Sequence, residues 1–237
     1  MINFKYKYIF CHNEKTAGTS MRNCLVPLGE NHYISNDLTE CNHSQINFTP
    51  VESYDDLPNQ HMSMSRYKKL LNIDDFFTFG FVRNPMDRAF SLYMQQLKYF
   101  LDDQNISSDF IYENQDKIRL NVDERLNKSL GLDMGYYRFD FDFFIRVFLL
   151  KFGSLQYKQF CDKDKNILCK FIGRFENLQE DCNKVFDKIG VDRIRLPLKN
   201  KSNIARYAYK DFFTNDLKDF FIENYKDEFE VFGYEKG

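Results

Sequence analysis

The sequence predicts a three-layer α/β/α fold with a central, mostly parallel β-sheet, formed by a single domain over residues 1–237. Apolar runs typical of buried strands alternate with amphipathic segments of about ten or more residues, which is the pattern of a helix-covered parallel sheet. A chain of 237 residues with 43% hydrophobic content can also bury one large core. Ligands of such sheets lie at the carboxyl ends of the strands, so the residues that follow each strand are the candidates for a site.

The N-terminal quarter begins with a strand and a helix. Residues 4–11 are almost continuously apolar and predict a buried strand. Residues 20–28 place apolar side chains on one helical face, and Thr19 or Ser20 is expected to cap that helix. The segment 29–60 is polar and predicts a loop that contains one short strand near the sequence "HYIS".

The next part of the chain repeats the order of helix, strand and helix. Residues 62–71 predict a short amphipathic helix, and residues 74–82 predict a second buried strand. Pro85 suits the first position of a helix, and apolar residues recur through 86–101 with the spacing of a core-facing helix. Residues 102–138 are polar with weak periodicity, so they form either a helical insertion or a flap.

Three further elements complete the expected order. Residues 140–152 predict a helix and residues 166–173 a strand. The apolar stripe of residues 178–189 predicts a helix that Gly190 ends. A C-terminal helix is expected to begin at Thr214.

Composition argues against several classes of protein. The net charge of -2 provides no basic field, so we expect no nucleic-acid partner. No segment approaches the run of about 20 apolar residues that spans a membrane, and the charged N-terminus does not resemble a signal peptide, so a cytoplasmic protein is expected. The six cysteines show no metal-ligand spacing, which predicts reduced thiols and no metal.

The turn "HNEKTAGTS" at residues 12–20 has the composition of a phosphate-binding loop. Gly18 permits a tight turn and Lys15 supplies a mobile positive charge. The loop differs from a Walker A sequence, in which the lysine follows the last glycine. Taken alone, a capped and exposed turn explains it equally well. Its hydroxyl groups are on Thr16, Thr19 and Ser20.

A second candidate loop, "VRNPMDRAFS", follows the predicted strand 74–82. Arg83 at the strand end and Ser91 on the following helix are suited to a second phosphate. The alternative is that Arg83 and Arg88 pair with nearby aspartates on the surface. Two anion sites at one sheet edge indicate a nucleotide that carries phosphates at two separate places. The aspartates of the alternative are Asp74, Asp75 and Asp87.

Four segments in order make a resemblance specific: "HNEKTAGTS", "FGFVRNPMDRAFSLY", "FIGRFENLQED" and "LPLKNKS…FGY". Together they resemble the carbohydrate sulfotransferases that use 3'-phosphoadenosine 5'-phosphosulfate (PAPS), whose fold is similar to that of P-loop NTPases. The resemblance runs from about residue 8 to 234 and is weakest at 30–58 and 102–138. It implies that PAPS is the donor and that no metal is required.

The resemblance also assigns roles to the two loops. It implies that the loop from Lys15 to Ser20 holds the 5'-phosphosulfate, and that Arg83 with Ser91 holds the 3'-phosphate. The stretch that contains Lys201 and Ser202 resembles a loop that closes over the donor, although a solvated run of charges is an equal alternative. The residues implied in the first loop are Lys15, Thr16, Ala17, Gly18, Thr19 and Ser20.

One residue departs from the family pattern. The family usually has proline before the loop lysine, whereas this chain has Glu14. A buried carboxylate there would repel an anionic donor, so we expect Glu14 to face water.

Sulfuryl transfer requires a group that stabilises the leaving oxygen and a base that takes the acceptor proton. Lys15 is suited to the first role. Histidine is suited to the second, and the resemblance favours His61, with His43 as the competing candidate and an ordinary helix-terminal contact as the structural alternative. His12, inside the loop, is expected to shape it.

The expected acceptor is a hydroxyl of a saccharide or glycan, recognised mainly by residues 30–60 and 102–138. Two alternatives remain open. A metal-dependent glycosyltransferase would use Asp140 and Asp142 as a D-x-D site, although acids at the start of a helix also serve its dipole. A non-catalytic nucleotide- or glycan-binding module is favoured by Glu14.

Overall fold

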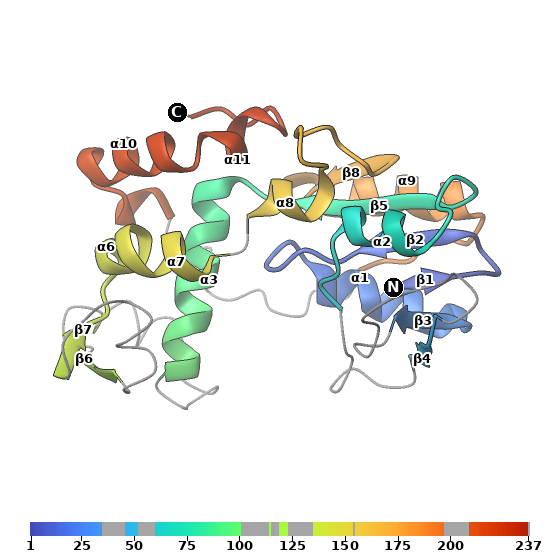
Figure 1. The fold of residues 1–237 in the computed structure, drawn as a ribbon, viewed down its shortest axis with the longest axis horizontal. Helices are drawn as coiled ribbons and strands as arrows, with labels where there is room; N and C mark the ends of the chain where they lie inside the picture. The colour runs from blue at the N-terminus through green and yellow to red at the C-terminus, as the bar shows by residue number, and fades with distance from the viewer. Residues whose placement is uncertain are drawn as a thin grey trace. The chain divides into compact units, whose positions relative to one another are not determined.

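The chain forms two compact units, each made of two stretches of sequence (Figure 1). Unit 1 comprises Met1–Arg83 and Leu155–Lys199, and unit 2 comprises Asn84–Ser154 and Asn200–Gly237. The expectation of one domain over residues 1–237 stays a prediction. The computed structural model describes residues 1–34, 46–51, 60–100, 114, 119–122, 135–153, 155–196 and 209–236.

Unit 1 is built on a six-stranded sheet in the order β4-β3-β1-β2-β5-β8, which can be followed in Figure 1. Strands β2, β5 and β8 run parallel, whereas the other pairings are antiparallel. The prediction of a mostly parallel sheet is therefore right only for β2, β5 and β8. The strands are β1 (Ile2–Asn3), β2 (Tyr8–Cys11), β3 (Asn31–Ile34), β4 (Phe48–Pro50), β5 (Phe77–Val82) and β8 (Phe171–Arg174).

The antiparallel half begins where the sequence predicted one long strand. The expected strand over residues 4–11 is broken by a turn, in which Lys7 adopts a φ of 51°. The chain reverses there, so Ile2 lies opposite Ile9. A connection this short can join only antiparallel strands, because a parallel pair needs a long crossover. The short strand expected near "HYIS" is confirmed as β3.

Helices pack on both faces of the sheet in the described part of unit 1. Helices α1 (Gly18–Leu25) and α9 (Leu178–Ile189) cover the face that carries Phe10 and Phe79. On the other face, the Phe160 ring of α8 (Gln156–Phe160) lies so close to Gly80 that a Cβ on Gly80 would be 2.2 Å away. A three-layer arrangement of the whole chain stays a prediction.

The ends of the unit 1 helices test the predicted caps. The cap expected at Thr19 or Ser20 is wrong, because α1 begins at Gly18 and its N-cap residue is Ala17, which forms no side-chain capping bond. Helix α1 also ends at Leu25, and the chain continues as the 3₁₀ turn η1 (Val26–Leu28). The predicted end of α9 at Gly190 is confirmed, with a φ of 74°.

Two other predicted elements of unit 1 have shifted boundaries. The helix predicted over 62–71 is α2 (Met64–Leu70), and Ser63 caps it. The strand predicted over 166–173 begins only at Phe171, because the preceding residues fold around Asp162. The Asp162 carboxylate accepts bonds from the backbone amides of Asp164 and Asn166, at 2.9 Å each.

Unit 2 is mainly helical. Its helices confirm the predictions of a helix from Pro85, of one over 140–152, and of one that begins at Thr214, which is its N-cap residue. The middle helix contains a π-helical stretch, η4. The described parts of 102–138 include an antiparallel strand pair, where a helical insertion or flap was expected. The elements are α3 (Pro85–Phe100), β6 (Arg119–Val122), β7 (Gly135–Arg138), α6 (Phe141–Phe143), η4 (Phe144–Leu149), α7 (Leu150–Phe152), η7 (Tyr209–Phe212), α10 (Asn215–Asn224) and α11 (Lys226–Glu230).

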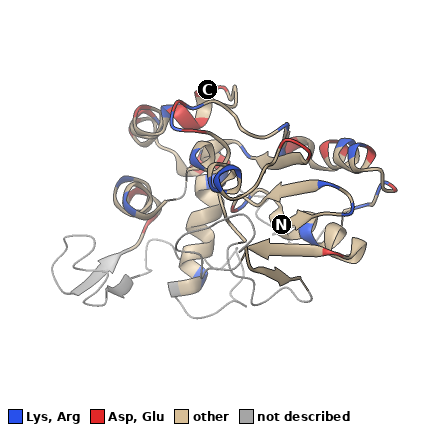
Figure 2. Cartoon of the chain, turned by 45° about the vertical axis from the view of Figure 1, so that its right-hand side comes forward, with Lys and Arg blue, Asp and Glu red and all other residues tan. Residues whose placement is uncertain are grey.

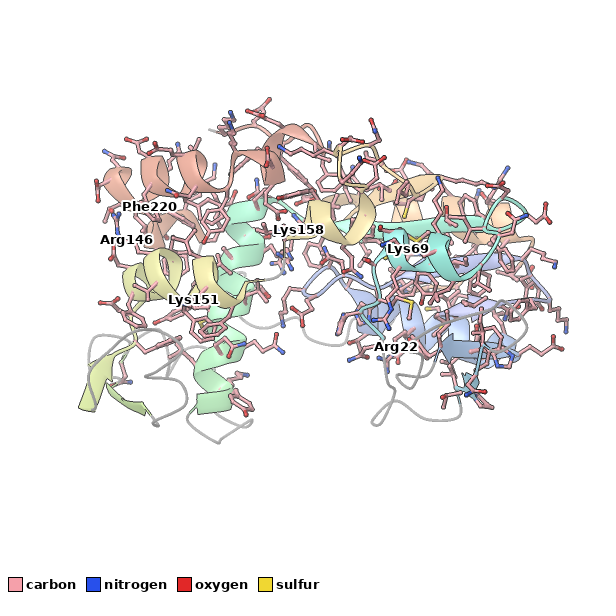
Figure 3. All side chains as sticks on the ribbon, in the orientation of Figure 1. Arg22, Lys69, Arg146, Lys151, Lys158 and Phe220 are labelled. Carbon is pink, nitrogen blue, oxygen red and sulfur yellow. The ribbon has the colours of Figure 1, made fainter. Side chains whose placement is uncertain are left out.

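The core of unit 2 is aromatic. Tyr93 of α3 packs against the rings of Phe141 and Phe144, and its hydroxyl donates to the carbonyl of Phe139. On the same unit, Arg146 lies over the ring of Phe220, as Figure 3 shows. These contacts give unit 2 its own core.

The described residues show a mixed distribution of charges (Figure 2) and reduced cysteines. Figure 2 shows Lys and Arg interspersed with Asp and Glu over the described elements. Burial raises the pKa of the Cys11 thiol to about 12, which keeps it protonated. Among the described helices, none combines the length and apolar character needed to cross a membrane. The described cysteines, none of which is in a disulfide, are Cys11, Cys24, Cys161, Cys169 and Cys182, and Cys41 lies outside the described residues.

Candidate anion-binding site

The turn between β2 and α1 is held by left-handed residues that are not glycine. Lys15 has a φ of 64° and Ala17 a φ of 65°. A left-handed residue with a side chain costs about 1–2 kcal/mol, so two of them in one turn mark a constrained segment. Left-handed residues within a turn can direct successive backbone N–H groups into one concavity, which binds anions. The N-terminus of α1 follows directly and adds N–H groups that have no partner within the helix.

Gly18 is required by a close contact, in keeping with the tight turn expected there from the sequence. Its φ is not positive, but a Cβ there would lie 1.7 Å from Nε2 of His12. The His12 ring is 6% exposed and stacks on Phe10, with ring centroids 5.7 Å apart. His12 therefore forms the floor of the turn, consistent with the expectation that it shapes the loop.

His12 is a neutral imidazole in this environment. Burial is the largest of the causes that lower its pKa well below the usual 6.5, and the nearby His61 acts in the same direction. Its Nδ1 atom is buried without a hydrogen-bond partner among the described residues. A neutral ring adds no charge of its own to the site.

The hydroxyl groups of the turn differ in their surroundings. Thr16 is buried, and its hydroxyl donates to the carbonyl of Asn13 at 3.0 Å, which closes the loop on itself. Thr19 is exposed and Ser20 is half-buried at the start of α1. Of the three predicted hydroxyl ligands, Thr16 thus also supports the loop from within.

Arg83 reaches this turn from the end of β5. Its guanidinium donates to the carbonyl of Lys15 at 3.2 Å and lies 4.2 Å from the centre of the Phe175 ring. The neighbouring strands β2 and β5 are parallel, so their carboxyl ends meet at the same edge. The structure therefore brings Lys15 and Arg83 together, and their phosphate contacts stay predictions.

Ser91 and Arg88 both belong to helix α3 of unit 2. Ser91 is half-buried on α3 in unit 2. Arg88 is buried in the same unit, 3.9 Å from the carboxylate of Glu228, which argues against the surface pairing considered for it. Lys201 and Ser202 lie outside the described residues.

His61 lies beside the turn, just before α2. Its Nδ1 atom is 3.1 Å from the carbonyl oxygen of His12. Because a carbonyl can only accept, Nδ1 is assigned the hydrogen, which leaves the lone pair of the neutral ring on Nε2. The Nε2 atom lies 4.0 Å from a carboxylate oxygen of Glu14. The competing candidate His43 lies outside the described residues.

Glu14 is partly exposed, in accord with the expectation that it faces water. Its side chain is 40% exposed, and that of His61 is 36% exposed. The carboxylate thus lies toward the histidine and also contacts solvent. This contact was not anticipated from the sequence.

Two glutamines of the short helix α8 bond to segments of the site, and no sequence motif predicted them. Gln156 is fully buried and bonds to Asn13 and to the backbone of Arg83. Gln159 donates to the carbonyls of His61 and Met62. Neither glutamine belongs to a phosphate-binding or catalytic motif. Only their spacing of three residues could have suggested that they lie on the same face of a helix.

Asp140 and Asp142 serve the helix that they begin. The Asp140 carboxylate accepts from the backbone amide of Phe143 at 2.8 Å, and Asp142 pairs with Arg146 at 3.0 Å. These contacts favour the helix-start interpretation over a D-x-D site. Across the described parts of the chain, no group of three or more His, Cys, Asp or Glu residues is arranged to hold a metal ion.

A parallel strand, a turn with left-handed residues, a lysine and a neighbouring arginine are typical of α/β proteins that bind phosphate- or sulfate-bearing ligands. A model of the sulfotransferase family matches residues 1–235, which is nearly the whole chain. The chain belongs to the sulfotransferase family. Neither a curated protein nor a solved structure matches it.

Family membership confirms the resemblance found from the sequence motifs. It identifies the chain as a sulfotransferase and implies a sulfuryl donor and an acceptor substrate. The family alone does not specify which sulfuryl donor and which acceptor the protein uses.

Proposed function

We propose that the protein transfers a sulfuryl group from PAPS to a hydroxyl of a saccharide or glycan. The contact between Arg83 and the Lys15 carbonyl carries this proposal, since it joins the two segments expected to bind the two phosphate-bearing ends of the donor. The saccharide acceptor rests on the resemblance to carbohydrate sulfotransferases.

The residues of the turn fit the 5'-phosphosulfate. Backbone N–H groups near Lys15 and Ala17, with the start of α1, supply donors for an anion, and the Lys15 ammonium supplies a mobile charge. The Arg83 guanidinium suits the 3'-phosphate, because its planar fork matches phosphate oxygens. Phe175 supports that guanidinium from one side.

The proposed reaction is an in-line displacement at sulfur. The acceptor oxygen forms a bond to sulfur while the bond from sulfur to the bridging phosphate oxygen breaks. Lys15 stabilises the negative charge that develops on the bridging oxygen. The hydroxyl proton passes to Nε2 of His61, whose orientation is fixed by the Nδ1 contact with the His12 carbonyl.

Glu14 supports the state that follows proton transfer. Once Nε2 carries a proton, the imidazolium faces the Glu14 carboxylate across 4.0 Å. Partial exposure of both groups weakens the attraction through solvent screening. In this proposal, the unusual glutamate serves the base.

The decisive test compares two nucleotides by calorimetry. The wild-type protein is expected to bind 3'-phosphoadenosine 5'-phosphate (PAP) more tightly than 5'-AMP, because Arg83 contacts the additional phosphate. Equal affinities would remove the two-phosphate donor. Tight PAP binding without turnover on any saccharide would instead favour the non-catalytic module, and manganese-dependent turnover would favour the glycosyltransferase.

A further inference from the structure

The short helix α8 presents two glutamines to the candidate site from a part of the sequence that carries no motif. Gln156 and Gln159 are three residues apart, which places them on one side of the helix. Between them, the exposed Lys158 is labelled on α8 in Figure 3. All the groups that the two glutamines contact belong to unit 1.

Gln156 joins the two donor segments. Its amide oxygen accepts from the Arg83 backbone N–H at 2.9 Å, and its amide nitrogen donates to the Arg83 carbonyl at 2.9 Å. These paired bonds satisfy the Arg83 peptide groups in the way that a neighbouring strand would. The same amide oxygen also accepts from the Asn13 side chain at 3.2 Å. A single buried amide thus connects the segment before Lys15 to the start of the Arg83 segment.

Gln159 joins the strand end to the histidine. Its amide nitrogen donates to the carbonyl of His61 at 2.9 Å and to that of Met62 at 3.0 Å. The same nitrogen lies 3.4 Å from the carbonyl of His12, which is also the partner of the His61 ring. This residue therefore fixes the backbone from which the proposed base projects.

We propose that Gln156 and Gln159 are positioning residues with separate roles, Gln156 for the donor and Gln159 for the base. The inference rests on the proposed function, since it assigns to each glutamine one half of that reaction. Gln156 acts through Arg83 and Asn13, and Gln159 acts through the His61 backbone. Neither side chain needs to contact the substrate.

The experiment replaces each glutamine by methionine, which has a similar volume and no hydrogen-bonding amide. Gln156→Met is expected to weaken PAP binding about tenfold in calorimetry and to narrow the ratio of PAP to 5'-AMP affinity. Gln159→Met is expected to leave PAP affinity within about twofold. Lys158→Met, at the exposed position between them, is the matched control and is expected to change neither affinity.

The base is monitored by nitrogen NMR of the His61 ring. In the wild-type protein and in Gln156→Met, we expect the neutral ring to carry its hydrogen on Nδ1. In Gln159→Met, we expect the tautomer with its hydrogen on Nε2 to gain population. The reason is that Gln159 no longer fixes the His61 backbone beside the His12 carbonyl, so the Nδ1 contact weakens. Equal effects of the two variants on either readout would overturn the division of roles.

A second variant, Gln156→Asn, and amide hydrogen exchange at Arg83 provide two further tests. Should Gln156→Met fail to fold, Gln156→Asn retains a neutral amide but shortens its reach, and the same loss of PAP discrimination is expected. If wild-type protein binds PAP and 5'-AMP equally, the proposed donor is wrong, and amide exchange decides the inference. Faster exchange at Arg83 in Gln156→Met than in Gln159→Met supports it, and equal exchange overturns it.

Discussion

The two segments proposed to bind the donor meet at one edge of the sheet, but they are stabilised differently. The turn at Lys15 has stabilising contacts among its own residues, namely the Thr16 bond to Asn13 and the packing of Gly18 on His12, in addition to the bonds with Gln156 and Arg83. The Arg83 segment is stabilised by groups that are distant in sequence, namely the amide of Gln156 and the ring of Phe175. A short motif can therefore describe the first segment, whereas the second depends on the fold.

The largest expected effect is on turnover and concerns His61, which belongs to neither of the two segments. His61→Ala removes the proposed base, so turnover on an accepted saccharide should fall about 10²- to 10⁴-fold. PAP affinity should change little, because the ring lies beside the turn. Steady-state kinetics and calorimetry measure the two quantities. A wild-type rate in His61→Ala together with a slow His43→Ala would transfer the role of base to His43.

In the turn between β2 and α1, Lys15→Ala should lower turnover about 10²- to 10³-fold and also weaken PAP binding, because the lysine charge meets the donor before and during transfer. Lys15→Gly is the matched control, since it removes the same ammonium but relaxes the left-handed backbone. Similar losses in both variants identify the charge as the cause. Recovery of activity in Lys15→Gly would show that backbone strain was responsible.

Gly18→Ala tests how closely the turn is packed. Its Cβ would overlap the His12 ring, so we expect a loss of about 1–3 kcal/mol in the free energy of unfolding, measured with denaturant. PAP affinity should fall as well. In Gly190→Ala, the new Cβ meets no atom within 4 Å, and only the φ of 74° is strained. A larger stability loss in Gly190→Ala would contradict the proposed contact.

The smallest expected effect is on PAP affinity and concerns Arg83, whose segment is stabilised by residues distant in the sequence. Arg83→Lys retains the charge but loses the planar contact with Phe175, so PAP affinity should fall about tenfold while 5'-AMP affinity changes little. The exposed Arg195 provides the control variant Arg195→Lys. An equal loss for both nucleotides would place Arg83 away from the 3'-phosphate.

The sequence predicted those features that depend on local pattern. Strand β5, the helix from Pro85 and the helix starts at Asp140 and Thr214 follow from apolar runs and from residues with known end preferences. Lys15 and Arg83 were correctly expected at neighbouring strand ends, because parallel strands present these ends together.

The missed features depend on contacts across the chain or on backbone angles. The left-handed φ of Lys15 has no signature in residue type, since such angles are usual for glycine. The antiparallel pairing of β1 depends on a turn at Lys7 within an apolar run. Helix α8 is short, and Gln156 contacts Arg83 only because the fold brings together two residues that are 73 positions apart.

The neutral ring beneath Gly18 makes the donor turn acid-sensitive. The pKa of His12 is lowered in the folded protein, so the folded state resists a proton that the unfolded chain accepts near pH 6.5. Stability supplied by the buried ring is therefore complete above the unfolded pKa and is lost as the pH falls through and below it. In mild acid, opening around β2 and α1 would be favoured by protonation of the ring on which the turn is built.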